Sequence, residues 1–331
     1  MTKALQFAGA VVAVALLGAL GTVPAQAAID GHFERTLTVN GPVDLDVTTG
    51  SGNITIHAGD ANKVEVHATI RANESWRSSE KDTESRVQYI EQHPPVEQNG
   101  NTITIGHIED RELMRNISIS YDIVTPAQTH VHSATGSGNQ TVQGVSGPAE
   151  TSAGSGDVRL NDIGADVTAR TGSGEITITG VKGALRASSG SGSIRGEQIS
   201  GAITASTGSG DVRLAQAGSG DVEVSTGSGS VEVNGVNGAV RIGTGSGNIS
   251  AQGTPAGNWR LHTGSGDLTV ELPQQTSFEL YAHTSSGSIE SKFPITVQGT
   301  ISPRDLHGKV GSGGPVVDLR TSSGTIHIES K

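Results

Sequence analysis

The residues of this 331-residue chain best suited to chemistry are acidic side chains that recur directly after a Gly-Ser-Gly tripeptide. They are Asp157, Glu175, Asp211 and Asp267, with Asp221 as a further case in an extra half-coil, where the nine-residue unit appears twice in one turn. Calcium binds carboxylate oxygens, and some glycine-rich nonapeptide rolls are built around it. The motif of those rolls is G-G-x-G-x-D, however, whereas here the acid follows Gly-Ser-Gly at once. Ser193 and Ser230 also interrupt the acidic column.

A solvent-exposed ladder of charges is therefore the favoured interpretation of the acidic column. Arg159, Arg195 and Arg213 stand two residues further along three of the repeats, where they would offset the repulsion between stacked carboxylates. Calcium binding is kept as the alternative. No other metal and no cofactor is predicted.

Histidines form two pairs that could bind a metal. His262 and His283 each precede a threonine that opens a repeat, which predicts that they lie one above the other. His130 and His132 are two residues apart and would share one face of a strand. A zinc site needs three or four ligands, and neither pair has an evident third. We therefore expect exposed histidines that bind no metal.

The repeated serines do not resemble nucleophiles or phosphate ligands. A nucleophile elbow has the form G-x-S-x-G between a strand and a helix, and a phosphate loop is followed by lysine and a helix. Neither pattern is present. The best place for a site is the irregular segment 273–320, which gathers polar and aromatic residues: Phe278, Tyr281, Phe293, Arg304, Asp305, His307 and Lys309. The alternative is that this segment only caps an open core.

The element that must position all these residues is a repeat of fixed length. The Gly-Ser-Gly serines Ser137, Ser155, Ser173, Ser191 and Ser209 are each 18 residues apart, and three more follow at spacings of 19, 18 and 19. A constant period of this length is typical of a solenoid, in which each repeat is one coil stacked on the next.

The apolar residues of one repeat predict two short strands per coil. From Thr171 they are Ile176, Ile178, Val181, Leu185 and Ala187. The first two and the last two alternate with polar residues, as in strands with one buried face. Parallel crossovers are almost always right-handed. The predicted fold is thus all-β, a single-stranded right-handed parallel β-helix (β-solenoid) with coils of about 18 residues. The threonines that open the repeats, such as Thr171 and Thr207, would form a hydroxyl column at a corner, which is a poor match to an ice-binding strand face.

Residues 1–27 are predicted to be a cleaved signal peptide, with Lys3, an apolar stretch and an Ala25-Gln26-Ala27 cleavage site. We therefore expect export to the periplasm, the cell surface or the medium, with no transmembrane anchor in the mature chain. The sequence contains no cysteine, which excludes disulfides. A formal net charge of −11 disfavours nucleic acid as a partner.

Two further regions are predicted. Residues 28–134 would hold strands, including 102–105 and 117–124, and a lid with one short helix over 74–92, whose apolar face includes Trp76, Val87 and Ile90. Residues 135–331 would form the Gly-Ser-Gly β-helix, with an irregular cap at 272–320.

One stretch carries a family resemblance. Residues 121–138, YDIVTPAQTHVHSATGSG, lead into serial repeats of GSG, an Asp, Asn or Glu, and alternating apolar residues. This pattern resembles a bacterial family of exported β-strand-repeat proteins labelled as adhesins or as a domain of unknown function. The resemblance covers most of the chain after residue 33. It implies export, a β-helix and a role in surface interaction, and it transfers no catalytic residue.

The sequence thus predicts a non-enzymatic scaffold of the cell envelope or surface that acts through its extended β faces. Its partner would be an unidentified envelope or surface component, protein or glycan. The alternative is a β-helix protein that binds or cleaves envelope polysaccharide at a site near 278–309.

Overall fold

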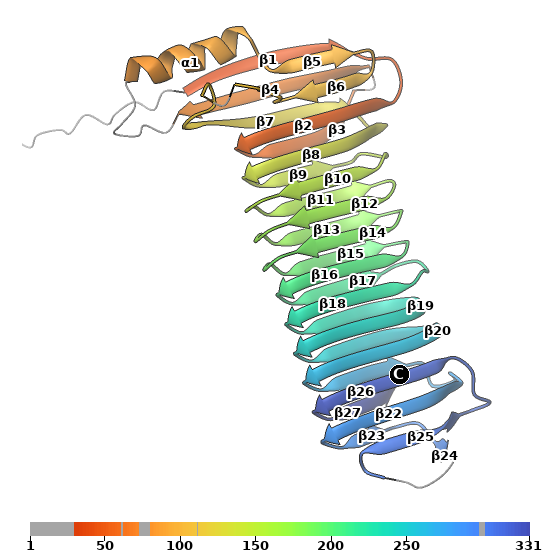
Figure 1. Cartoon of the computed structure of the whole chain (residues 1–331). Helices are drawn as coiled ribbons and strands as arrows, with labels where there is room; N and C mark the ends of the chain where they lie inside the picture. Colours follow the sequence, from red (N-terminus) through yellow and green to blue (C-terminus); the bar gives the residue numbers. More distant parts are fainter. Residues whose placement is uncertain (1–29, 61, 73–79, 111, 298–301) are drawn as a thin grey trace, which may run out of the picture.

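The chain forms a long stack of coils in a computed structural model that describes residues 30–331 except 61, 73–79, 111 and 298–301 (Figure 1). All 27 strands of the described residues belong to one hydrogen-bonded sheet. The prediction of an all-β solenoid is confirmed. The predicted signal peptide and Trp76 lie outside the described residues.

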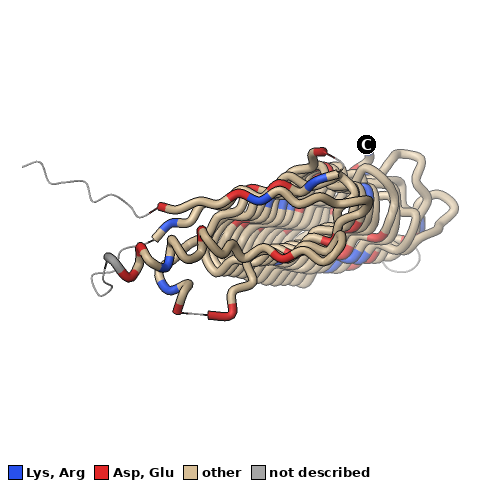
Figure 2. The backbone as a smooth tube through the Cα atoms, turned by 90° about the horizontal axis from the view of Figure 1, so that it is seen from above, with Lys and Arg blue, Asp and Glu red and all other residues tan. Residues whose placement is uncertain are grey.

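The central coils each contain two strands that pair in parallel with their equivalents one coil away. Val158 is opposite Ile176, which is opposite Ile194 on its other side. The strands are β8 (Thr129–Ser137), β9 (Gln140–Gln143), β10 (Ala149–Ala153), β11 (Val158–Ile163), β12 (Val167–Thr171), β13 (Ile176–Val181), β14 (Leu185–Ser189), β15 (Ile194–Ile199), β16 (Ile203–Ser209), β17 (Val212–Gln216), β18 (Val222–Ser228), β19 (Val231–Ser246), β20 (Ile249–Ser265) and β21 (Leu268–Leu272). Strands β19 and β20 each run through a corner, so each contributes to two coils. Seen along the stack, the coils superimpose in a flattened outline (Figure 2).

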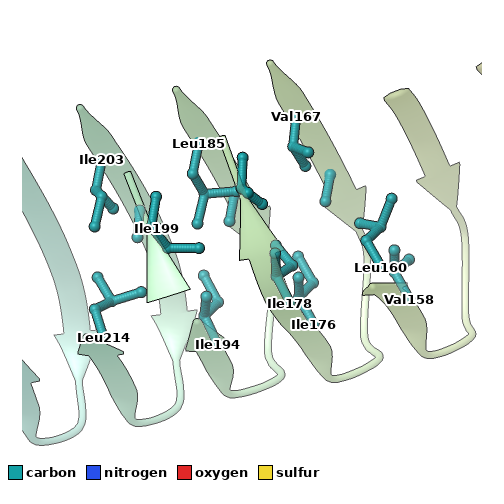
Figure 3. Packing of buried hydrophobic residues seen from close by; sticks show 14 of the residues in the cluster. Val158, Leu160, Val167, Ile176, Ile178, Leu185, Ile194, Ile199, Ile203 and Leu214 are labelled. Carbon is teal, nitrogen blue, oxygen red and sulfur yellow. The ribbon is translucent and has the colours of Figure 1, made fainter. Parts of the chain in front are cut away.

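The core is a set of aliphatic columns that run along the stack (Figure 3). The five apolar positions of the repeat are all buried, with Ile176 and Ile178 at 0% exposed and Ala187 at 4%. Each large aliphatic side chain contributes about 1.5–3 kcal/mol when it is buried. The positions chosen from the two-residue alternation are therefore confirmed as the core.

The Thr-Gly-Ser-Gly corner is explained by close backbone stacking. A Cβ at Gly174 would lie 1.8 Å from the carbonyl oxygen of Gly156, and one at Gly172 would lie 2.4 Å from that of Gly154. Only glycine allows such an approach. The serine between them is exposed, whereas Thr171 is buried and donates a hydrogen bond of 2.9 Å to the Gly156 carbonyl. The threonine column thus lies inside the solenoid and cannot be an ice-binding face.

The N-terminal end contains a coil out of chain order. Its elements are β1 (Asp30–Thr38), β2 (Val43–Ser51), β3 (Ile54–Gly59), β4 (Lys63–Ala72), α1 (Glu80–Gln92), β5 (Val96–Asn99), β6 (Thr102–Ile105) and β7 (Ile117–Pro126). Strand β2 pairs with β6 on one side and β8 on the other, and β3 pairs with β7 and β9. The coil of residues 43–59 therefore lies between two later segments, and the stack begins before residue 135.

A cap of antiparallel strands and one helix closes this end. Strand β1 pairs with β4, which pairs with β7, both antiparallel. Helix α1 lies beside β1 (Figure 1), where Glu91 accepts a hydrogen bond of 2.8 Å from the His32 amide. The described part of the helix starts at Glu80, and residues 74–79 of the predicted helix lie outside the described residues. Its residues Val87 and Ile90 are buried, as expected.

The C-terminal end repeats this arrangement. It contains β22 (Phe278–Ser286), β23 (Ile289–Ser291), β24 (Ile295–Val297), β25 (Asp305–Val310), β26 (Val316–Ser323) and β27 (Ile326–Ser330). Strand β26 pairs with β20 on one side and β22 on the other, and β27 pairs with β21 and β23. The last coil, residues 316–330, thus lies between two earlier ones (Figure 1). We call residues 43–59 and 316–330 the interposed coils.

Candidate functional site

Most members of the acidic column bind the backbone of the next coil. The Asp157 carboxylate accepts a hydrogen bond of 3.0 Å from the Glu175 amide, and Asp211 accepts one of 3.0 Å from the Ser230 amide. Asn248 does the same at 2.9 Å for the Asp267 amide. A short side chain with an oxygen acceptor is what these positions require, which explains why Asp, Asn and Ser alternate in the column.

The arginines lie where the sequence placed them. Arg159 contacts Asp157 at 3.0 Å and Arg213 contacts Asp211 at 3.1 Å, while Arg195 contacts Glu175 on the preceding coil. These pairs are exposed, so each contributes little to stability. The carboxylates are therefore occupied by backbone amides and arginines.

Asp221 does not belong to this column. Its neighbour Val222 is opposite Ile203, which places Asp221 at the other corner of the coil. There it accepts a hydrogen bond of 3.0 Å from the Ala239 amide, as Asp166 does at 2.8 Å for Ala184. The extra half-coil expected at residues 218–221 is thus the second corner of the coil, and only the expected stacking of Asp221 with the other four acids was wrong.

The stacking of His262 on His283 was also wrong. The interposed coil brings Arg320 between them, opposite His262 on one side and His283 on the other. His130 and His132 do share one exposed face, and their nearest acids are Asp44 at 3.4 Å and Glu150 at 3.8 Å, respectively. Within the described residues, no group of three or more His, Cys, Asp or Glu side chains is arranged to hold a metal ion.

Some of the candidate residues of the segment 273–320 are buried in the cap, and the others lie on an exposed face. Phe278 and Phe293 are buried and pack edge to face, with ring centroids 5.4 Å apart. Lys309 pairs with Glu279 at 3.4 Å, and Arg304 is exposed. Tyr281, Asp305 and His307 are the members that gather around one cavity.

This cavity has a volume of about 290 Å³ and opens on the outer face of β22, β25 and β26. Tyr281 is 38% exposed and stacks on His307 across the antiparallel pair, with centroids 4.1 Å apart. His283 Nδ1 lies 2.5 Å from an oxygen of Asp305. An aromatic platform is thereby bordered by groups that donate and accept hydrogen bonds.

Two further residues of the cavity, Asp318 and Arg320, were missed by the sequence analysis. Arg320 donates two hydrogen bonds to Asp318, of 2.8 and 3.1 Å, and this ion pair raises the pKa of the arginine. Asp318 also lies 3.7 Å from Arg260. Both residues belong to the interposed coil, so only the order of the coils in space brings them to Tyr281.

A second aromatic pair lies at the opposite end of the stack. Tyr89, on α1, is 52% exposed and stacks on His93 with centroids 4.5 Å apart. It lines a cavity of about 530 Å³ between α1 and residues 107–110 and Leu113. The described part of the chain contains no helix with the length and apolarity needed to span a membrane.

Comparisons with known proteins identify the family of this chain but give no activity for it. No curated protein matches the sequence. The solved structure of a "putative cell adhesion protein" from Clostridium sporogenes is 12% identical, with 91% of this chain and 100% of that chain covered and a TM-score of 0.28. That of a "putative adhesin" from Bacteroides fragilis is 13% identical, with 90% and 96% covered and a TM-score of 0.32. Likenesses this low carry no inference about function. The sequence itself matches the Toastrack DUF4097 family over residues 43–329, and the chain belongs to that family.

Proposed function

We propose that the protein is an exported, non-enzymatic interaction scaffold of the cell envelope, a right-handed β-solenoid that holds two binding surfaces at the ends of a rod. The observation that carries this proposal is the position of its exposed aromatic residues. Among the described residues, the exposed large hydrophobic side chains are Tyr89 and Tyr281, one in each cap and each stacked on a histidine.

The faces between the caps support a spacer role. Positions of Lys, Arg, Asp and Glu lie along the stack (Figure 2), and the exposed residues of these faces include none of the large hydrophobic ones. Aromatic side chains are enriched where proteins bind partners, because one ring contributes a large contact area at a low entropic cost. The caps are thus better suited to binding than the extended β faces that the sequence suggested.

The acidic side chains of the column are proposed to accept hydrogen bonds from backbone amides rather than to bind calcium. Export remains a prediction from residues 1–27. Cell fractionation with protease shaving of intact cells tests the location. Protein in the periplasm, at the surface or in the medium agrees with export, and protein in the cytoplasm contradicts it.

Co-sedimentation of the mature chain with isolated bacterial cell envelopes tests the scaffold proposal. We expect saturable binding that falls when Tyr89→Ala or Tyr281→Ala removes an exposed ring, with thermal melting unchanged. A chain that stays in the supernatant at all concentrations contradicts the proposal.

The second candidate is an enzyme that cleaves envelope polysaccharide at 278–309, and the contact between His283 and Asp305 favours it. A histidine oriented by a carboxylate is a common general base. Release of reducing ends or unsaturated sugars from a polysaccharide, lost in Asp305→Ala without loss of folding, would replace the scaffold proposal. Alanine substitution of Arg304 and His307 extends the same test.

A further inference from the structure

The outer face at the C-terminal end arranges eight side chains in two rows across four neighbouring strands. Strand pairings place them in register on β25, β22, β26 and β20. One row is His307, Tyr281, Asp318 and Arg260, and the other is Asp305, His283, Arg320 and His262. We call these eight residues the terminal patch. All are exposed except Asp318, whose side chain is 13% exposed.

Tyr281 gives the terminal patch an apolar platform. His307 stacks face to face on the Tyr281 ring, with centroids 4.1 Å apart, so it covers one face of that ring and fixes the ring's orientation. The apolar C–H face of a sugar ring packs well on such a ring, and the rings' polar edges remain free for hydrogen bonds. The cavity beside it, about 290 Å³, is at the lower end of the range for small-ligand pockets.

Arginines make the adjoining part of the terminal patch attractive to anions. Arg260 lies directly opposite Arg241 on the neighbouring strand of the coil before it. Like charges opposite one another in a sheet are destabilising, and Arg241 makes no ion pair with any described residue. Arg320 is held in place by Asp318 through two hydrogen bonds. Asp318 pairs with both Arg320 and Arg260, at 2.8 and 3.7 Å. Glu223 is opposite Arg241 on its other side, so the group carries both signs and Arg241 is its arginine without an ion pair among the described residues.

The spacing of these groups suits an extended chain of sugars. Adjacent strands are about 4.8 Å apart, which is comparable to the length of one pyranose unit. A saccharide that runs along the stack would thus place one ring on Tyr281 while a later unit lies over Arg260 and Arg241. Arginine binds carboxylates through paired N–H groups, and Asp305 and His283 are placed to hydrogen bond sugar hydroxyls.

We propose that the terminal patch, together with Arg241 beside it, binds an acidic saccharide, with a sugar ring on Tyr281 and a carboxylate of a later unit, two strands or about 10 Å further along, on Arg260 and Arg241. This inference rests on the proposed scaffold function and names the ligand class of one of its two ends. It assigns no chemical step to His283 or Asp305.

Titration of the mature chain with trigalacturonic acid tests the proposal, with histidine ring signals followed by NMR and affinity by calorimetry. We expect saturable binding at millimolar concentrations or below, weakened by added salt because the contact is ionic. Maltotriose, a neutral trisaccharide, should bind at least about tenfold more weakly, a difference of about 1.4 kcal/mol.

Variants locate the site. Tyr281→Ala and Arg260→Gln should each weaken binding of trigalacturonic acid about tenfold or more, whereas Tyr281→Phe keeps the ring and should bind normally. Arg186→Gln changes an exposed arginine on β14 in the middle of the rod and is the matched control for Arg260→Gln, expected to bind as the unmodified chain does. Thermal melting of each variant confirms that the fold is retained.

Absence of trigalacturonic acid binding, or binding that is unchanged in Tyr281→Ala, overturns the proposal. If envelopes still bind the chain in that case, the scaffold function stands and only the acidic-saccharide assignment fails. If neither envelopes nor trigalacturonic acid bind, both proposals fail.

Discussion

Replacing a buried threonine of the solenoid by valine should lower the free energy of unfolding at one position and raise it at another. Thr171 is 6% exposed; its hydroxyl donates to the Gly156 carbonyl at 2.9 Å and accepts from the Gly174 amide at 3.1 Å. Thr151 is 3% exposed, and its hydroxyl has no hydrogen-bond partner among the described residues. Valine replaces the hydroxyl by a methyl group of similar size in both cases.

The expected effects follow from the hydrogen bonds. Thr171→Val removes two of them, at about 1 kcal/mol each, and leaves a carbonyl and an amide of the corner without this partner, so we expect a loss of about 2–3 kcal/mol in the free energy of unfolding. Thr151→Val removes a hydroxyl that is buried without a partner and adds a buried methyl worth about 0.8 kcal/mol, so we expect a gain of about 1 kcal/mol.

Urea unfolding followed by far-UV circular dichroism measures both changes. The midpoint should fall for Thr171→Val and rise for Thr151→Val, with the slope unchanged in each. If both midpoints move in the same direction, or if Thr171→Val is as stable as the unmodified chain, the hydroxyl column does not stabilise the corners as described.

Four further changes probe the core, the corners, calcium and alkaline pH. Gly174→Ala places a Cβ 1.8 Å from a backbone oxygen and should lower the melting temperature strongly, whereas Gly243→Ala, with nothing within 4 Å, should not. Val233→Asp buries an unpaired charge in a side chain that is 0% exposed, so cooperative melting should be lost; an unchanged melting midpoint would contradict the coil register. Melting should shift little between chelator and millimolar calcium, and a rise of many degrees would show a metal site in the acidic column. Burial raises the pKa of Tyr121, so the folded chain keeps this proton while the unfolded chain loses it. Stability should therefore fall as pH rises above about 10, and less steeply in Tyr121→Phe.

The repeat was predictable because its signals are local. Ile176 and Ile178 alternate with polar residues, and the Gly-Ser-Gly period sets which residues stack, so core and corners follow from spacing alone. The hydrogen-bonding role of the acidic column could be predicted in part from the residue types that occur in it. Asn248 and Ser193 replace an acid, and the oxygen acceptor that they share with Asp157 points to a hydrogen bond rather than to a cation.

The order of the coils at the two ends was not predictable from these signals. Residues 284–291, TSSGSIES, and 321–328, TSSGTIHI, carry the same corner and nearly the same strand. Either could stack on Thr263 and its coil, because parallel pairing depends on backbone groups that every residue has. The proximity of Arg320 to Tyr281 depends on this choice, so the terminal patch could not be assembled from the sequence.

The interposed coils also separate the order of synthesis from the order of assembly. Residues 278–291 leave the ribosome before residues 316–330, yet they belong one coil further out. Until residues 316–330 are available, the coil of β20 and β21 has no partner on its C-terminal side. Because the corner motifs match, residues 278–291 can stack on it directly, in the place that residues 316–330 occupy in the folded chain. The first coil likewise waits for residues 102–143 to supply both of its neighbours. Sequential addition of coils from one terminus can therefore build the middle of the rod. The C-terminal end closes when the last coil enters between two earlier ones, and the N-terminal end closes when two later segments add to the two sides of the first coil.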